Sequence, residues 1–276
     1  MKKIIPLLYL YLLLLPASAC AAQPHRILAL TPHICEMLYA IGAQAQLVGD
    51  VDYCNYPAAA KKLPRIGSYN RINVEAALRL KPDIAVVMSR NVSGVGMLEK
   101  MGVRIIVSNP ANFNDIFNDL LKLGVLTGHT DKAKAVVAKL RERLQKVRAM
   151  PRSGTTVFYE VWYDPLLTAG GPSFISSLIH EAGGRNVFAG LNVEIPRVNV
   201  EAVIRARPGL IVIPLDHRDF KARRAFWEHW LGKGKVRFAA INPDLLNRPG
   251  PRLIDGLELL QKALQNQHPL AADGHR

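Results

Sequence analysis

Side chains that could bind a ligand gather in a few short segments of this chain, most of them directly after an apolar run. Tyr, Trp, His, Arg and Asp are concentrated in the segments 31–33, 52–57, 67–70, 88–91, 162–165, 216–218 and 242–252. Aromatic rings together with guanidinium and small polar groups suit a large, flat, partly polar ligand. Any one of these side chains could be a packing residue, so it is their concentration that indicates a binding site.

The same segments lack the patterns of known catalytic and metal sites. The chain has no G-x-S-x-G motif, no phosphate loop and no G-x-G-x-x-G after a strand. His33 and His217 could face each other as two imidazoles, but a metal site usually needs three or four ligands at recognisable spacing. We therefore predict a binding protein rather than an enzyme, with no cofactor and no metal ion held by the protein.

The N-terminus has the three parts of a secretory signal peptide. Lys2 and Lys3 precede an apolar run over 4–15, and Pro16 leads into small residues up to Ala22. The run is shorter than the roughly 20 residues of a membrane span. We expect residues 1–22 to be removed on export, although cleavage before Cys20 would instead leave a cysteine that could carry a lipid.

Two cysteines, Cys35 and Cys54, remain after the expected cleavage. An even pair in an oxidising compartment permits a disulfide, and a loop of this length would contribute about 3 kcal/mol if it closed without strain. Two free, buried thiols fit the sequence equally well.

A repeat within the chain predicts its architecture. Residues 72–87 read INVEAALRLKPDIAVV and residues 198–213 read VNVEAVIRARPGLIVI, 126 positions later. Each copy predicts a short helix capped by Asn73 or Asn199, followed by a buried strand. Glu75 and Glu201 occupy matching positions in the first helical turn, where an acid complements the helix dipole. They could equally be matched docking charges for a two-fold-symmetric partner.

The repeat favours two α/β lobes, each a mostly parallel sheet covered by helices. We place the lobes at residues 23–128 and 153–276, joined by one long, rigid helix over 129–152. Its apolar face comprises Ala133, Val136, Val137, Leu140, Leu144 and Val147. A helix of about 19 residues spans roughly 28 Å, enough to bridge two lobes. Because ligands of open α/β sheets lie beyond the carboxyl ends of the strands, we expect a cleft between the lobes.

The formal charge of +14 suggests an anionic ligand, a membrane surface or nucleic acid. Export and the lack of an aromatic-basic motif argue against nucleic acid. A solvated basic surface is the plainer explanation.

Several segments together resemble a known family. These are ILALTPHICEMLYAIGA, VGDVDYCNYP, LPRIGSYNRINVEAALRLKPDIAVV, PLLTAGGPSFISSLIHEAGGRNVF and NRPGPRLIDGLELL. They are similar to the periplasmic cobalamin-binding proteins of ABC importers, over about residues 25–263. That family belongs to the binding proteins with a helical backbone, which also carry haem and iron-siderophores.

The resemblance implies a monomer in the periplasm that captures cobalamin or another corrinoid and passes it to an ABC permease dimer. Glu75 and Glu201 match glutamates that dock on the permease. The ligand-binding residues expected from the resemblance and from the strand-end segments are Pro32, His33, Tyr53, Tyr69, Met88, Trp162, Asp244 and Arg248. Met88 replaces an aromatic residue of the family, so the preferred corrinoid could differ. A haem or iron-siderophore protein of the same fold is the rival, and an exported enzyme is the rival from another class.

Overall fold

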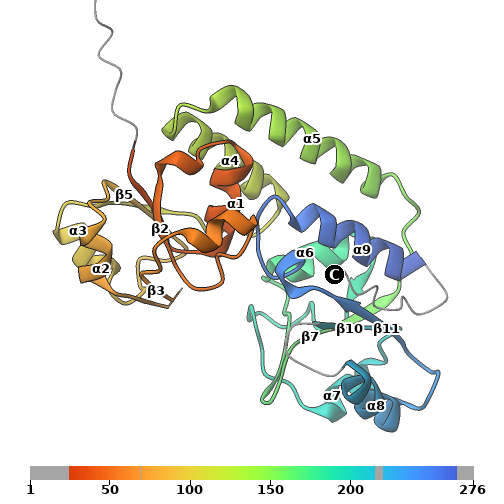
Figure 1. Cartoon of the computed structure of the whole chain (residues 1–276). Helices are drawn as coiled ribbons and strands as arrows, with labels where there is room; N and C mark the ends of the chain where they lie inside the picture. The colour runs from red at the N-terminus through yellow and green to blue at the C-terminus, as the bar shows by residue number, and fades with distance from the viewer. Residues whose placement is uncertain (1–24, 69, 215–219, 266–276) are drawn as a thin grey trace, which may run out of the picture.

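The computed structural model describes residues 25–68, 70–214 and 220–265 (Figure 1). The predicted signal peptide over 1–22, with Cys20, lies outside the described residues, as do Tyr69 and His217. Within the described part, no helix is both long enough and apolar enough to cross a lipid bilayer.

The first lobe is built on four parallel strands in the order β2-β1-β5-β6. The strands are β1 (Ile27–Ala29), β2 (Leu47–Asp50), β5 (Ile84–Val87) and β6 (Arg104–Val107). The helices of this lobe are α1 (Pro32–Ala40), α2 (Val74–Arg79), α3 (Val95–Lys100) and α4 (Phe113–Leu126). A two-stranded ribbon joins β3 (Gly67–Ser68) to β4 (Arg71–Ile72). Every residue of β5 is buried, as predicted for a strand covered on both faces.

The second lobe repeats this plan around the order β11-β10-β7, with β9 parallel and β8 antiparallel to β7. Its strands are β7 (Thr156–Tyr163), β8 (Leu166–Thr168), β9 (Arg185–Asn186), β10 (Leu210–Pro214) and β11 (Arg237–Ile241). Its helices are α6 (Phe174–Glu181), α7 (Val200–Ala206), α8 (Phe220–Leu231) and α9 (Leu253–Gln265). Short 3-10 turns occur at η1 (Gln44–Gln46), η2 (Ala58–Lys62) and η3 (Pro243–Leu245).

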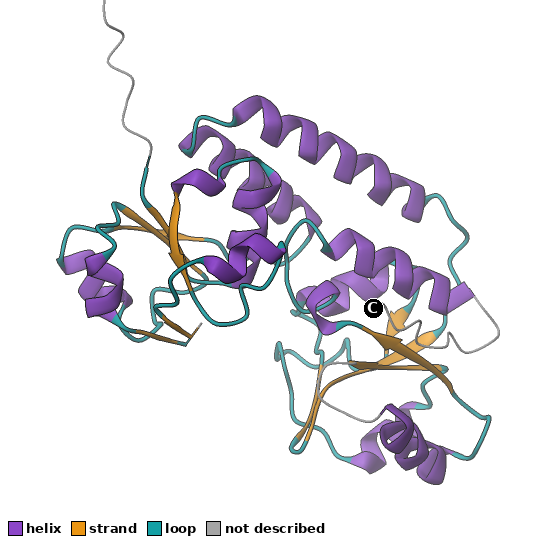
Figure 2. Ribbon diagram, viewed as in Figure 1, coloured by secondary structure: helices purple, strands orange, loops and turns teal. Residues whose placement is uncertain are grey.

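Strand β10 shows why a continuous apolar run was needed here. Successive side chains of a strand point to opposite faces, and Leu210 and Val212 join the core that extends into the first lobe. Ile211 and Ile213 join a second core around Trp227, under α7 and α8. Both faces of the sheet are covered by helices (Figure 2). The predicted fold class, two mostly parallel sheets each covered by helices, is confirmed.

The sequence repeat is also a structural repeat. Asn73 caps α2 by accepting a hydrogen bond from the Ala76 amide, and Asn199 caps α7 by accepting one from Ala202. After each helix, the residue before proline turns left-handed, with φ of 48° at Lys81 and 47° at Arg207. Each copy therefore sends its chain from a capped helix into a central strand of its sheet.

The long helix of the prediction forms as α5 (Thr130–Arg148). Its predicted apolar face is buried, except that Val136 is half-buried, and it packs against α4 of the first lobe and α9 of the second (Figure 1). The helix stops before Met150 because Pro151 follows, and a residue preceding proline is disfavoured in the helical conformation. The lobe boundaries at residues 128 and 153 stay predictions.

Candidate functional site

The described candidate residues lie at the carboxyl ends of strands in both lobes. Tyr53 follows β2, Pro32 follows β1 and Met88 follows β5, and these three strands are neighbours in one sheet. Trp162 is the last residue but one of β7, before the hairpin to β8, and Asp244 follows β11. Each lobe therefore presents its candidate residues along one edge of its sheet.

Large apolar side chains are exposed along these edges. The exposed fraction is 60% for Tyr53, 39% for Trp162 and 37% for Met88. The Trp162 indole donates to the Asp164 carbonyl at 2.8 Å and its ring lies 5.6 Å from that of Tyr163. Exposed apolar groups that gather at one place mark a binding surface more often than scattered ones do.

Tyr53 has a strained backbone, with a φ of 69°. The left-handed conformation costs a residue with a side chain roughly 1–2 kcal/mol, and such strain concentrates at functional sites. The exposed Tyr53 follows β2 in the chain, between Asp52 and the buried Cys54.

Hydrogen bonds between the loops of the two edges show that the edges face each other. The side-chain Nδ2 of Asn55 donates to the Asp244 carboxylate at 3.2 Å, and Arg248 donates to the side-chain Oδ1 of Asn55 at 2.8 Å. The guanidinium of Arg252 lies 3.9 Å from the centre of the Tyr56 ring, a cation–π contact. The segment after β2, residues 51–57, is therefore bound to the segment after β11; we call residues 51–57 the β2 loop.

Glu36 anchors the second lobe to the first. Its carboxylate, on α1, is 3% exposed, and it accepts from Arg248 at 3.2 Å and from Arg252 at 3.0 and 2.6 Å. A buried carboxylate needs such partners, because removing it from water is costly. Gly250 lies against α1, because a Cβ at this position would be 3.4 Å from the Cβ of His33, an ordinary van der Waals contact.

Sequence reasoning missed Glu36, although a signal was present. Glu36 is the one acid in an apolar helical stretch over 34–39. A charged residue that shares a helix turn with buried apolar residues must find an opposite charge. What the sequence alone does not show is that the partners come from the other lobe.

Arg248 was predicted to meet the ligand, and the structure gives it protein partners. It is buried and ion-paired with Glu36 at 3.2 Å and with Asp244 at 2.5 Å. Its observed contacts position the loop after β11 against the first lobe. Asp244 takes part in the same network and remains partly exposed.

His33 is also buried, at 3% exposure. Its ring contacts the Thr31 hydroxyl at 2.9 Å and the Ser108 hydroxyl at 3.3 Å, and Ser108 donates to Asp119 at 2.6 Å. Burial lowers the pKa of His33 to about 4, against a smaller opposing effect of Ser108. This enclosed, neutral ring does not reach the exposed edge in the structure, so His33 is not among the ligand contacts that we propose below.

Glu75 and Glu201 are exposed in the first turns of α2 and α7. The Glu75 side chain is 82% exposed and accepts from Arg79 at 2.9 Å. Helices α2 and α7 lie on different lobes (Figure 1). Each lobe therefore offers one acid at an equivalent, solvent-facing position.

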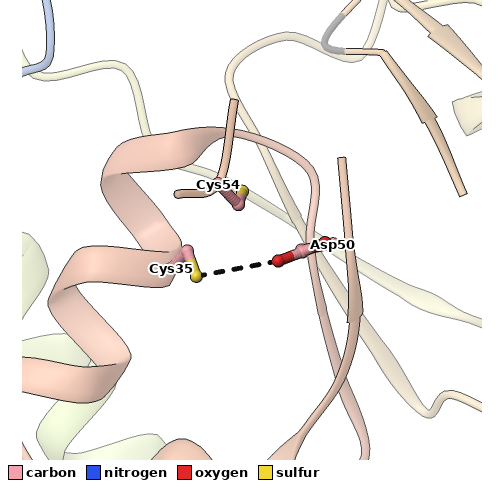
Figure 3. A group of neighbouring side chains, drawn as sticks. All are labelled: Cys35, Asp50 and Cys54. Carbon is pink, nitrogen blue, oxygen red and sulfur yellow. Dashed lines mark hydrogen bonds between the residues drawn. The ribbon is translucent and has the colours of Figure 1, made fainter. Parts of the chain in front are cut away.

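Cys35 and Cys54 are buried free thiols that lie side by side with Asp50 (Figure 3). The ligand atoms of these three residues all lie within 4.8 Å of one another. The Cys35 thiol donates to Asp50 at 3.9 Å. The structure thus confirms that the thiols are buried and adds that they are adjacent.

A hollow of about 620 Å³ lies elsewhere, between β6 and α4. Its walls are mainly apolar, with Ile106, Val107 and Leu126 among them. None of the predicted ligand residues lines this hollow.

Comparison with known proteins places the chain among transport proteins. The model of a family described as periplasmic binding protein matches residues 27–223. The vitamin B12-binding protein of Yersinia pestis (strain Pestoides F) is 30% identical over 275 residues, which is 97% of this chain and 95% of the relative.

Solved structures agree with this assignment. The periplasmic vitamin B12-binding protein BtuF of Vibrio cholerae has a TM-score of 0.76 and 27% identity, covering 88% of this chain and 97% of that one. A periplasmic haem-binding protein from Pseudomonas aeruginosa has a TM-score of 0.76 and 26% identity, covering 90% of this chain and 95% of that one.

Proposed function

We propose that this chain, which belongs to the periplasmic binding protein family, captures cobalamin or a related corrinoid between its lobes and delivers it to an ABC importer. The observation that carries the proposal is the pair of facing sheet edges, each with exposed apolar side chains. The similarity to vitamin B12-binding proteins over nearly the whole chain supports the choice of ligand.

A corrinoid is a flat macrocycle, so side chains must pack against both of its faces to bury it; we call each such set of side chains a ligand wall. Tyr53, Pro32 and Met88 of the first lobe would cover one face, and Trp162 of the second lobe would cover the other. Burial of aromatic and thioether side chains against the ring supplies the hydrophobic part of the affinity. Tyr69, which lies outside the described residues, belongs to the first wall by the resemblance.

The anchor around Glu36 makes the site largely pre-formed. Arg248 and Arg252 hold the second lobe on α1, while α5 packs on both lobes. A site that is already ordered loses little conformational entropy when the ligand binds. The protein binds, orients and releases its ligand; no bond of the ligand is made or broken.

Delivery requires a second surface, for which Glu75 and Glu201 are the proposed residues. Two acids at equivalent positions of two lobes match two basic pockets of a dimeric permease. The protein would work in the periplasm as a monomer after removal of residues 1–22, or on a lipid anchor at Cys20.

Calorimetric titration of residues 23–276, freed of ligand, tests the proposal. Cyanocobalamin and cobinamide should bind one-to-one, with an affinity that changes little with salt because the corrin face is mostly uncharged. Haemin and a ferric siderophore are the comparison ligands, since haem-binding proteins share the fold. Binding of haemin or the siderophore alone would keep the fold and overturn the proposed ligand.

Trp162→Ala tests the second wall. Loss of an aromatic contact of this kind should weaken cyanocobalamin binding roughly 10- to 100-fold, since each 1.4 kcal/mol is a factor of ten. Met97→Ala is the matched control, because Met97 is an exposed apolar residue on α3, outside the two edges. Equal affinities for the Trp162→Ala and Met97→Ala proteins would remove Trp162 from the site.

A further inference from the structure

The two buried thiols lie where three structural elements meet. Cys35 is on α1, Cys54 is in the β2 loop and Asp50 ends β2 (Figure 3). None of the three is more than 1% exposed. The sulfur atoms lie within 4.8 Å of each other, whereas an S–S bond is about 2 Å long, so the bond requires the two thiols to move closer.

We infer that Cys35 and Cys54 form a disulfide in the oxidising compartment, and that this bond holds the β2 loop on α1 and so keeps the ligand wall in place. The second half of this inference rests on the proposed function, because it concerns Tyr53 as a ligand contact.

The position of Asp50 suits the chemistry of bond formation. Both thiols are buried, but Cys54 lies in the β2 loop between the exposed Tyr53 and the partly exposed Asn55, so an opening of this loop would expose Cys54 first. The Cys54 thiolate attacks the disulfide of an oxidant of the thiol–disulfide class and releases one thiol of that oxidant. Cys35 then gives its proton to Asp50 and attacks the sulfur of Cys54, which releases the second thiol. Two protons and two electrons pass from the cysteines to the oxidant.

The surroundings keep Cys35 from reacting by itself. The hydrogen bond with Cys54, then burial and the nearby acids, raise the pKa of the Cys35 thiol. Burial raises the pKa of Asp50 to about 7, against the lowering effect of Arg65. A carboxylate with this pKa can accept a proton near neutral pH, as the second step requires.

The charges favour a disulfide over a bound metal ion. Two cysteines and an aspartate could hold a thiophilic cation, but Asp50 already pairs with Arg65 at 2.5 Å. The guanidinium would repel a cation beside it. A disulfide is uncharged, so it leaves the pair between Asp50 and Arg65 balanced.

The bond would link two parts of the inter-lobe contact. Cys35 precedes Glu36, which holds Arg248 and Arg252. Cys54 lies between Tyr53, the exposed aromatic of the first wall, and Asn55, which holds Asp244 and Arg248. Joining the two cysteines fixes both segments in the arrangement that the second lobe requires.

Thiol counting tests the bond without any ligand. Residues 23–276, purified from the periplasm without reductant, are unfolded in an alkylating agent and weighed by mass spectrometry. We expect no alkyl group and a mass two hydrogens below that of the reduced chain. Two alkylated cysteines would overturn the inference, whether the protein is metal-free or carries one stoichiometric thiophilic ion by elemental analysis.

Thermal unfolding with and without reductant provides a second test of the bond, and a variant without the two cysteines is its control. Reductant should lower the Tm of the oxidised protein by roughly 6–12 °C, from the entropy of closing a loop of this size. The double variant Cys35→Ser, Cys54→Ser should show no response to reductant; a response of the same size in this variant would overturn the inference.

Cyanocobalamin dissociation tests the link to the ligand wall. The reduced protein should release the ligand several-fold faster than the oxidised protein. Equal dissociation rates for the two proteins would overturn the link to Tyr53. If neither protein binds a corrinoid, the proposed function is contradicted. The thiol count would still decide whether the disulfide forms.

Discussion

At the scale of single residues, burial changes what a side chain can do. His33 and Tyr53 lie close to the same sheet edge, but one ring is enclosed by hydroxyl groups and the other is largely in solvent. The enclosed imidazole is neutral at physiological pH, and the exposed phenol remains free to stack on a ligand. Residue type alone does not distinguish these two roles.

His33 should make the stability of the protein fall in mild acid. Its pKa is about 4 in the folded protein and 6.5 in a model peptide. Between these values the unfolded chain binds the proton and the folded chain does not, so stability is lost as pH falls from 6.5 toward 4. The full effect is about 3 kcal/mol, at 1.36 kcal/mol per pH unit.

Urea unfolding of the wild type and His33→Gln between pH 4 and 8 measures this effect. Asp50, with its raised pKa, shifts the curve of both proteins in the opposite sense. The difference between the two curves therefore reports His33. A difference that does not vary with pH would contradict the prediction.

At the scale of elements, the repeat shows how local sequence determines local structure. The Asn-Val-Glu-Ala motif places an amide oxygen over the first helical turn in both lobes, and Lys81-Pro82 and Arg207-Pro208 end both helices. These interactions join residues at most four positions apart. Such short-range interactions are what a repeat in the sequence can reveal.

Removal of either cap should destabilise the protein. Asn73→Ala and Asn199→Ala each remove the hydrogen bond to an otherwise unpaired amide, at a cost of about 1 kcal/mol. Chemical unfolding measures the cost. Asn118→Ala is the control, because Asn118 is exposed inside α4, where alanine favours the helix. A loss of stability in the control as large as in the cap variants would contradict the assignment.

At the scale of the whole molecule, three features hold the lobes together. A continuous core of buried residues contains side chains of both sheets, α5 packs on α4 and α9, and Glu36 pairs with two arginines of the second lobe. The first two are apolar and the third is ionic. Together they limit hinge motion, so the proposed ligand wall of one lobe stays opposite that of the other.

Glu36→Gln should weaken the contact between the lobes more than a substitution of a surface residue does. The substitution leaves the buried Arg248 and the partly buried Arg252 with reduced compensation, and loss of one partner of a buried pair costs about 3–5 kcal/mol. Chemical unfolding gives the cost, and amide exchange in the segment after β11 should rise. Glu142→Gln is the control, since Glu142 pairs with Lys146 in solvent and should change neither measurement. Unchanged exchange in Glu36→Gln would argue against an anchor.

Glu75 and Glu201 should matter for delivery and not for capture. Both acids are exposed, so Glu75→Ala and Glu201→Ala should leave the fold and the affinity for cyanocobalamin unchanged. Uptake of labelled cyanocobalamin by cells should fall strongly in each variant, and most in the double variant. Glu142→Ala, an exposed acid on α5, should take up ligand normally. Normal uptake by the double variant would mean that the two acids only complement the dipoles of their helices and do not dock on the permease.

The sequence by itself determined the elements and the edge at which the proposed site lies. Periodicity, caps and prolines act over a few residues, so they predicted the repeat, the parallel sheets and the extent of α5 to within about one helical turn. Since parallel strands end at one edge, the positions of Tyr53, Met88 and Trp162 followed from the order of the segments.

Only the tertiary structure decided which side chains meet. Glu36 pairs with Arg248 and Arg252 across 212 and 216 positions, and Cys35 and Cys54 share a buried site with Asp50. The enclosure of His33 on α1 likewise depends on Ser108, which directly follows β6. Burial and ion pairing depend on distances between elements, and packing of the whole chain sets those distances.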